Sequence, residues 1–392
     1  MTGVYELDRE AMPAVGRPHH FGLSPSVLVT LGGEAEARLE ATSTRERPMS
    51  GTITVEPPAG WAVEQGEFPI QELNAEHPFA EQIHLRQEGD RPSAATGFVR
   101  LDGDLFDQEQ PFTVIRLGDA AAPVRVTERR EADQPLWEID NGRCLWTIAP
   151  DYHAGVIGWR DGDRSVNHLL TTFPKPGELS WMSPLLGGVR PSIMLSADGE
   201  DFPGKLHNET FTVSQIETAD ERGLLWSGLQ LETAITREGL EGLRVELAYS
   251  TVGDSNVLKV VFRLINDDDA YRRVEPRLLT FLQVDGRADN GVLYGDTLQR
   301  KRTSHMAWPK VGAWGAVENP DTGRTVALVA ASGRRDIILL DWGMAGGHLL
   351  LREHPLLAPK SSHDIVAYLI LADSVGEARQ YEMLAQPSTM KA

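Results

Sequence analysis

Turn-forming residues recur along almost the whole chain, and apolar and polar positions alternate between them. The clearest case is the segment 137–148, in which Asn141-Gly142 separates two alternating runs. Asn-Gly in this setting is the strongest short-range signal for a β-hairpin. Further strand-like runs, bounded by Gly, Asp or Pro, lie at 26–31, 35–41, 51–55, 81–86, 96–101, 112–117, 243–249 and 257–264. This pattern predicts an all-β protein built from antiparallel sheets.

One segment near the C-terminus favours a helix. Residues 375–384 follow the pair Asp373-Ser374, and serine is a preferred residue at a helix N-cap because its side chain accepts a free backbone N–H. We therefore predict a helix there.

The length of 392 residues exceeds that of one ordinary domain. Residues 1–20 have the mixed charge and prolines of a tail. Turn signals about every ten residues over 21–118 predict an immunoglobulin-like β-sandwich, and the small residues and proline of 119–124 predict a linker. Residues 125–392 then form a supersandwich, a propeller or two tandem sandwiches, and the absence of a repeat of about 40 to 50 residues disfavours the propeller.

The charge of the chain limits its partners. A formal net charge of -19 leaves no basic footprint for nucleic acid. The basic run Arg300-Lys301-Arg302 is short and isolated. We therefore expect neither nucleic acid nor another polyanion as a partner, and a homo-oligomer stays open.

The single cysteine, Cys144, excludes an internal disulfide and a cysteine-based zinc site, and we predict no metal. The glycine-rich pieces fit neither a phosphate loop nor a dinucleotide fingerprint, so we predict no cofactor. No run approaches about 18 apolar residues, which argues against a membrane span. The N-terminus lacks the apolar segment of a secretory signal, so we expect a cytoplasmic protein.

Polar chemistry concentrates among turns in the segment 181–211. It contains the corner Gly187-Gly188-Val189-Arg190-Pro191 and, further on, Leu206-His207-Asn208. This order and spacing resembles the galactose-mutarotase-like superfamily of sugar epimerases, especially the aldose 1-epimerase and glucose-6-phosphate 1-epimerase branch. The resemblance implies that residues 125–392 form a mutarotase-like β-supersandwich. It also implies that His207 is a general acid, although Asn208 stands where the family has glycine.

Two further elements are similar to the same family. The run 349–353, followed by Leu357-Ala358-Pro359-Lys360, looks like the strand and turn that carry the family's catalytic base, which implies that role for Glu353. The family's second histidine falls at Leu279 in this chain. His305, in the neighbouring run 302–308, is a candidate to replace it.

Other residues are candidates for contacts with a sugar. Arg190 presents a planar fork of donors that suits hydroxyls or a carboxylate. Trp181 and Trp308 lie in turn-rich segments where an exposed indole can stack on a sugar ring, and Asn208 is predicted to line the same site. Each of these residues also has a purely structural alternative. His207 could be a turn histidine whose ring is hydrogen-bonded by local backbone. Glu353 could form a surface ion pair with Arg352, and Arg190 could be a solvated arginine.

The sequence therefore favours a carbohydrate-active enzyme, an aldose 1-epimerase-like isomerase that uses His207 as acid and Glu353 as base. A polysaccharide lyase or glycoside hydrolase on the same scaffold is an alternative, because one fold hosts several chemistries. A non-catalytic carbohydrate-binding or assembly protein is the third, because the second histidine of the family is absent.

Overall fold

The structure is a computed structural model. It describes residues 19–386 except 46, 104–105, 163, 180–181, 195–203, 205, 290, 297, 302–306, 332–335 and 342–346. The chain forms two compact units: the described residues up to Asp90 together with Ala95–Ile115, and Arg91–Ala94 together with the described residues from Arg116. The segment predicted as a linker, 119–124, belongs to the second unit, where the Asp119 N–H donates to the carbonyl of Gly253 at 2.8 Å.

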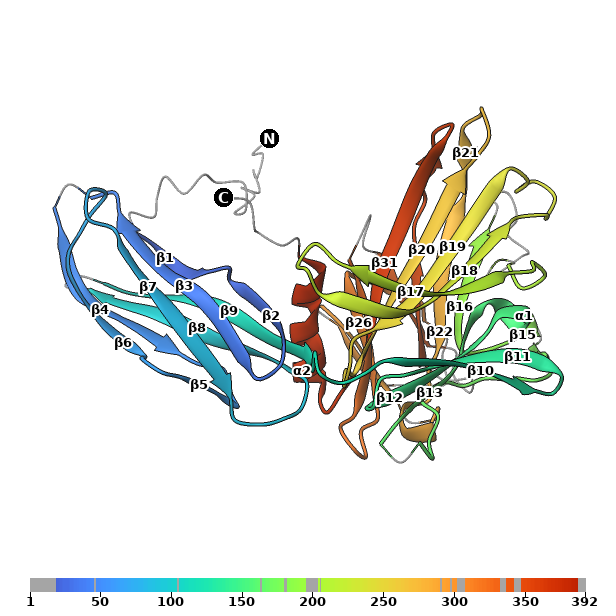
Figure 1. Ribbon diagram of the computed structural model, residues 1–392, viewed down its shortest axis with the longest axis horizontal. Coiled ribbons are helices and arrows are strands. Elements are labelled where there is room, and N and C mark those ends of the chain that lie inside the picture. The colour runs from blue at the N-terminus through green and yellow to red at the C-terminus, as the bar shows by residue number, and fades with distance from the viewer. Residues whose placement is uncertain are drawn as a thin grey trace, which may run out of the picture. The chain divides into compact units, whose positions relative to one another are not determined.

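The first unit is a sandwich of two antiparallel sheets (Figure 1). The four-stranded sheet has the order β1 (His19–Ser24), β3 (Glu34–Ser43), β7 (Phe79–Gln87) and β5 (Trp61–Val63). The five-stranded sheet has the order β2 (Val27–Leu31), β9 (Phe106–Gly118), β8 (Ser93–Gly103), β4 (Met49–Glu56) and β6 (Glu67–Leu73). β1 begins at His19, within the segment predicted as a tail.

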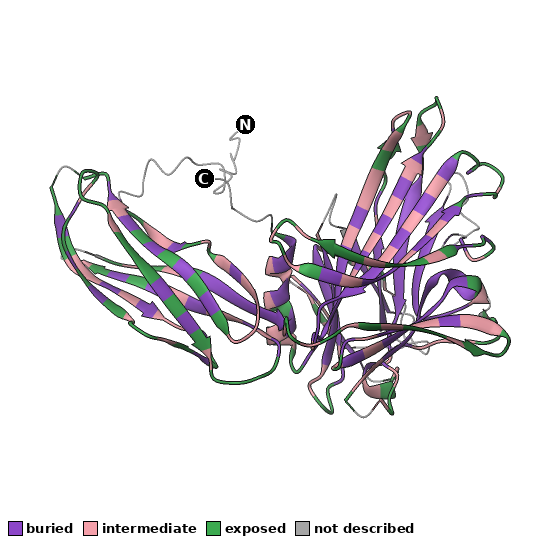
Figure 2. Ribbon diagram, viewed as in Figure 1, coloured by how far each residue is buried: buried purple, intermediate pink, exposed green. Residues whose placement is uncertain are grey.

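The alternation that predicted these strands reflects burial. Every second residue of β3 is buried, and Figure 2 shows the alternating bands along this strand. Successive side chains of a strand point to opposite faces, so one face of β3 reaches the core of the unit. That core includes Leu39, Ile53 and Val99, which are all fully buried.

The second unit contains two nine-stranded antiparallel sheets (Figure 1). Sheet I has the order β10 (Arg125–Glu131), β11 (Gln134–Asp140), β12 (Cys144–Ala149), β13 (Gly155–Asp161), β16 (Val189–Met194), β22 (Glu275–Phe281), β29 (Gly347–Arg352), β28 (Asp336–Asp341) and β25 (Lys310–Gly312). Sheet II has the order β17 (Thr212–Ala219), β18 (Leu225–Ala234), β19 (Leu243–Thr251), β20 (Val257–Asn266), β31 (Ser361–Ala372), β27 (Thr325–Ala330), β26 (Trp314–Glu318), β23 (Val292–Gly295) and β24 (Gln299–Lys301).

Smaller elements complete the second unit. Two ribbons pair β14 (Gly177–Leu179) with β15 (Met182–Leu185) and β21 (Arg272–Arg273) with β30 (Leu356–Leu357). The helical elements are α1 (Pro150–His153), η1 (Val284–Gly286), α2 (Val375–Gln380) and η3 (Tyr381–Ala385). The helix predicted near the C-terminus is confirmed, and the Ser374 hydroxyl accepts the Glu377 N–H as its cap. In the described part of the chain, no helix has the length and apolar character needed to cross a membrane.

One continuous apolar core lies between sheets I and II. It joins residues such as Val189 and Leu278 of sheet I to Leu247, Leu264 and Leu369 of sheet II. Burying one such side chain stabilises the fold by about 1.5 to 3 kcal/mol. The all-β architecture, with a large antiparallel supersandwich in the second unit, is confirmed.

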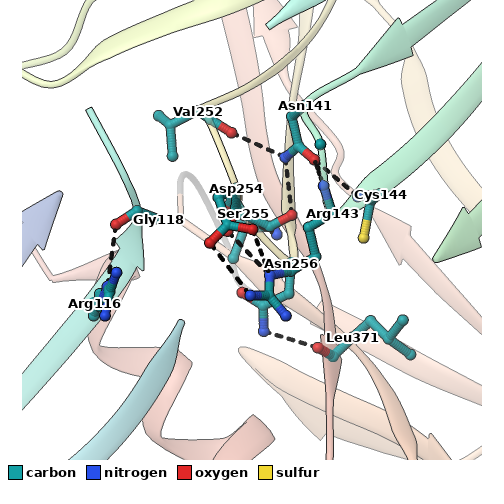
Figure 3. A network of polar contacts seen from close by, with 12 residues as sticks. Arg116, Gly118, Asn141, Arg143, Cys144, Val252, Asp254, Ser255, Asn256 and Leu371 are labelled. Atoms are coloured by element: carbon teal, nitrogen blue, oxygen red, sulfur yellow. Dashed lines mark hydrogen bonds and ion pairs between the residues drawn. The ribbon is translucent and has the colours of Figure 1, made fainter. Parts of the chain in front are cut away.

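The predicted Asn-Gly hairpin is present, and Asn141 gives it a structural role (Figure 3). The Asn141 side-chain oxygen accepts the N–H groups of Arg143 and Cys144, which closes the β11–β12 turn. Its amide donates to the carbonyls of Val252 and Ser255, both at 2.9 Å. Asn141 is fully buried and ties this turn to the connection between β19 and β20 in sheet II.

Candidate functional site

The two faces of sheet I have different surroundings. On β16, Val189 and Ile193 point inward to the core shared with sheet II. Successive residues of a strand point to opposite faces, so Arg190 points to the outer face. In register with Arg190, β22 presents Leu279 and β29 presents Leu350. Arg190 is thus the cation in a row of apolar side chains on the outer face.

Arg190 is buried, with 2% of its surface exposed. Its Nη1 donates to the Pro184 carbonyl at 3.3 Å, and its Nη2 donates to the Gly204 carbonyl at 3.1 Å. Burial lowers the pKa of the guanidinium to about 10, so it remains a cation at neutral pH. No carboxylate of the described residues forms an ion pair with it. A buried cation of this kind favours a ligand that brings lone pairs or negative charge.

His207 lies next to Arg190, and Nη2 of the arginine is 3.5 Å from Nδ1 of the imidazole. The ring is half-buried, in a turn whose neighbours hold it in place. Leu206 packs into the core, and the carboxylate of Glu209 accepts the Thr236 hydroxyl at 2.9 Å and the Thr236 N–H. The turn is therefore fastened to sheet II on either side of the histidine.

A single turn of helix, α1, brings a second histidine to this cluster. Pro150 occupies the first turn, where its missing N–H has no cost, and Tyr249 of β19 donates to the Ala154 carbonyl at 2.8 Å, which fixes the end of the helix. His153 is 1% exposed, and within the described part of the chain neither of its ring nitrogens has a hydrogen-bond partner. Burial first, and then the charge of Arg190, lower the pKa of His153 to about 3, so the ring is neutral.

Tyr152, the neighbour of His153 on α1, begins a chain of hydrogen bonds. The Thr172 hydroxyl donates to the Leu185 carbonyl at 2.7 Å, so the Tyr152 hydroxyl donates to Thr172 Oγ1 at 2.8 Å. Leu185 follows Pro184, whose carbonyl accepts from Arg190. Tyr152 therefore helps to fix the segment that holds the guanidinium. Burial raises the pKa of Tyr152, and the charge of Arg190 opposes that rise.

The glycine corner predicted from the sequence allows these segments to meet. Gly187 and Gly188 have φ values of 75° and 70°, in the region that glycine adopts without strain. A Cβ on Gly188 would lie 2.2 Å from the Val156 carbonyl oxygen and 3.4 Å from Nε2 of His153. Gly188 is needed because β13 and α1 approach its backbone so closely, and Gly187 is needed because a Cβ there would lie 2.2 Å from the Leu170 carbonyl oxygen.

Glu353, the predicted base, lies away from this cluster. Its Oε2 is 2.6 Å from Nε2 of His363, which is on β31 of sheet II. Both neighbours of Glu353 turn the other way, because Arg352 and His354 reach the carboxylate of Glu275 at 3.8 and 3.3 Å. Glu353 thus points inward from the end of β29, whereas Arg190 points outward from β16.

Leu279, at the position of the family's second histidine, is fully buried in an apolar cluster with Phe281, Leu340 and Leu350. No proton-transfer group replaces it at that position of β22. Leu279 packs against apolar neighbours. His207 is therefore the histidine of the family motif that lies near Arg190.

Trp181 and His305 fall outside the described residues. Trp308 is 51% exposed, next to Ala307, which forms a bridge with Asp341 at the end of β28. Asn208 is exposed beside His207. Of the predicted site residues that the structure describes, it brings together Arg190 and His207, and Asn208 is the next residue in the chain.

Tyr152 and His153 are the members of the cluster that the sequence did not predict. The signal that could have found them is the run Pro150 to His153 between a strand and Ala154-Gly155, where two aromatic polar side chains occupy a tight turn. No three metal-ligating side chains of the described residues are arranged around a common point.

A second polar region of the same unit has a different character. A cavity of about 510 Å³ beside Gly142 is lined by charged residues that include Asp140, Arg164 and Asp254. Arg164 pairs with Asp140 at 2.9 Å, and Asp254 pairs with Arg143 at 3.2 Å. These charges satisfy one another, whereas none of the described carboxylates pairs with Arg190.

Comparison with known proteins gave matches among solved structures only. No protein-family model matches the sequence, and no curated protein matches it. A galactose mutarotase-like protein from Clostridium acetobutylicum is 13% identical, with 64% of this chain and 98% of that chain covered and a TM-score of 0.47. An aldose 1-epimerase from Klebsiella pneumoniae, described as putative, is 8% identical, with 76% and 92% covered and a TM-score of 0.48. An α-galactosidase from Geobacillus stearothermophilus is 12% identical, with 63% and 41% covered and a TM-score of 0.38.

Proposed function

We propose that this chain is a carbohydrate-active protein that binds a sugar at Arg190 and His207 and acts on it as an aldose 1-epimerase-like isomerase. The observation that carries the proposal is the buried guanidinium of Arg190, which pairs with no described carboxylate and lies 3.5 Å from the half-buried imidazole of His207. The motif that joins these two residues in the sequence is the one that resembles sugar epimerases. Sugar hydroxyls supply the lone pairs that such a site lacks.

Interconversion of anomers needs hydrogen bonding or proton transfer at the ring oxygen and at the hydroxyl of C1. His207 is the group that the geometry offers for this purpose. Glu353 is engaged by His363, so the proposal places His207 in the site and Glu353 outside it. Asn208 and Trp308 are proposed sugar contacts because both are exposed. Trp181 and His305 stay proposed on sequence grounds.

Anomerisation assays test the proposal. Exchange between anomers, followed by NMR with a panel of aldohexoses, should be faster with the protein than without it. His207→Ala should slow the catalysed exchange about 100-fold or more, the usual contribution of such a group. His20→Ala, at an exposed position of β1, should keep the parent rate.

Two results would count against the isomerase. One is a parent protein that accelerates the exchange of no hexose, and the other is an equal rate for His207→Ala. A product that absorbs in the ultraviolet through a new double bond would point to a lyase instead.

A second candidate is a carbohydrate-binding protein without catalysis. It is favoured by Leu279, which is packed among apolar side chains, and by Glu353, which is paired on the opposite side of sheet I. This candidate predicts that a sugar shifts the NMR signals of His207 while the anomers exchange at the uncatalysed rate.

A further inference from the structure

We propose that β17, an edge strand of sheet II, is the surface through which two copies of this chain associate. The two β17 strands pair antiparallel about a twofold axis, the commonest symmetry of homo-oligomers, and join the two copies of sheet II into one continuous sheet. The proposal concerns assembly and does not depend on the sugar chemistry proposed above.

β17 is a long strand with an open side. It has eight residues, and its register with β18 is regular over the whole strand. On its other side, no strand of the described residues pairs with it. Six of its eight residues are exposed (Figure 2). The backbone N–H and C=O groups along such an edge are a template for a further strand.

The other edges of the two large sheets are protected. β10, at one edge of sheet I, carries five charges in seven residues. β25, at the other edge of sheet I, has three residues and an irregular register with β28. β24, at the far edge of sheet II, has three residues, of which two are basic. Charge, shortness and irregularity are usual devices against edge pairing.

β17 has none of these devices along its length. It contains no lysine and no proline, its register shows no bulge, and its one charged residue is Glu217. Natural sheets rarely leave a long edge strand in this state, because it invites pairing. The edge of β17 therefore remains open to a partner strand.

A second copy of β17 is the strand that fits this edge. Two antiparallel copies of one strand are related by a twofold axis perpendicular to the sheet, so side chains opposite each other lie on the same face. The odd-numbered residues of β17 lie on the inner face, because Gln215 is opposite Leu229 of the core, and the even-numbered residues lie on the outer face. The axis therefore passes at a residue of β17 and not between two residues.

One register places polar side chains opposite polar ones and apolar side chains opposite apolar ones. With the axis at Ile216, that side chain faces its own copy, and the remaining pairs are Val213 with Ala219, Ser214 with Thr218, and Gln215 with Glu217. The Gln215 amide is a donor, and the Glu217 carboxylate is an acceptor with room for more than the Ser227 hydroxyl at 3.4 Å. The twofold axis makes this contact occur twice.

The neighbouring registers lack this match. With the axis at Gln215, the carboxylate of Glu217 faces the apolar Val213. With the axis at Glu217, two carboxylates face each other, which is destabilising. The register centred on Ile216 is therefore the expected one, and it pairs residues 213–219 of both copies.

Analytical ultracentrifugation of the full chain over a concentration series tests the association. The parent should pass from a monomer of 43.2 kDa to a species of twice that mass. Gln215→Glu places a like charge opposite Glu217 at two symmetric positions, and at low salt it should raise the dissociation constant about 10-fold, whereas Gln215→Lys should lower it about 10-fold. Both changes are at an exposed position, and Thr127→Glu, at an exposed position of β10, should leave the constant unchanged.

A cysteine on the axis tests the register. Opposed Cα atoms of an antiparallel pair are about 4.5 to 5.5 Å apart, which a disulfide can span. Oxidation of Ile216→Cys should therefore give a covalent dimer, whereas Ser214→Cys, which faces Thr218, should stay monomeric on a denaturing gel. The natural Cys144 does not interfere, because it is fully buried and burial raises the pKa of its thiol to about 12.

A parent that stays monomeric at every concentration overturns the proposal. A dimer with the same dissociation constant in the parent, Gln215→Glu and Gln215→Lys does so as well, because that dimer uses another surface. A covalent dimer that forms with Ser214→Cys and not with Ile216→Cys would refute the register. Circular dichroism of each variant, compared with the parent, shows that the fold is kept.

Discussion

His153 is the least satisfied side chain of the candidate site. It is almost fully buried, and both of its ring nitrogens lack a hydrogen-bond partner among the described residues. An unsatisfied buried polar group costs about 1 to 3 kcal/mol, and the fold tolerates that cost beside Arg190. A neutral ring is the form that this environment can accept.

The stability of the protein should therefore depend on the protonation of His153. Its pKa falls from 6.5 to about 3 on folding, so the unfolded chain binds the proton more strongly. The stabilisation is fully present above pH 6.5 and is lost as the pH falls below that value. Between pH 7 and 5 we expect a loss of about 2 kcal/mol from this group.

Urea denaturation at several pH values measures this loss. His153→Phe removes the titrating ring, so its free energy of unfolding should fall less than that of the parent between pH 7 and 5. His20→Phe, at an exposed position, should follow the parent. Parallel pH curves for the parent and His153→Phe would contradict the assignment.

At the scale of single residues, the sequence predicted the pair Arg190 and His207 through the order of a known motif. It could not predict the direction of Glu353. The face on which a strand residue lies changes with each position, and nothing in the run 349–353 shows where β29 ends. His153 was missed because its importance comes from Arg190, which is 37 positions away in the sequence.

Among the elements, the Gly187-Gly188 corner decides whether the site can form. It ends one segment of the loop and starts β16, the strand that carries Arg190. The corner lies against the carbonyls of Leu170 and Val156. Glycine is required at both positions for two reasons: the φ values are positive, and a Cβ would collide with a neighbouring carbonyl.

Gly188→Ala should test this role against a matched glycine. Gly223 has a φ of 78°, and nothing lies within 4 Å of a Cβ built on it. Gly223→Ala should lower the free energy of unfolding by about 1 to 2 kcal/mol, because alanine is strained in the left-handed conformation. Gly188→Ala should cost at least about 2 kcal/mol more, because its Cβ would overlap the Val156 carbonyl.

Thermal unfolding of the two variants gives the comparison, and the NMR signals of His207 report on the site. An equal loss of unfolding free energy in the two variants would show that the Val156 carbonyl moves to make room for the new Cβ. Gly223→Ala should leave the His207 signals unchanged, whereas Gly188→Ala should shift them.

The elements themselves were largely predictable. Strands with strict alternation, such as β3 and β20, appear where the pattern placed them, because one face is buried and the other is not. The short helix α1 was not predicted. Four residues are too few to show a helical period, and its position depends on Tyr249 of a distant strand.

At the scale of the whole molecule, each of the two units has a large apolar core of its own. One includes Leu39 of the first unit, and the other includes Leu264 of the second. The two clusters share no residue. Each unit therefore has its own source of stability.

Calorimetry of the full chain should resolve two transitions. Leu39→Ala and Leu264→Ala each remove a fully buried side chain, at a cost of about 2 to 5 kcal/mol. Each variant should lower the temperature of one transition and leave the other in place. A single transition that both variants lower equally would mean that the units unfold together.

The anchoring of Arg190 has one more consequence. The oxygens of Pro184 and Gly204 that accept from its guanidinium are main-chain atoms. Gly204 itself must stay glycine, because its φ is 107° and a Cβ there would lie 2.7 Å from the Ile193 carbonyl oxygen. Other side chains along the neighbouring loops can therefore be diversified while the loop lengths are kept. A library built in this way would vary the surroundings of the proposed sugar site and keep the two main-chain contacts of Arg190.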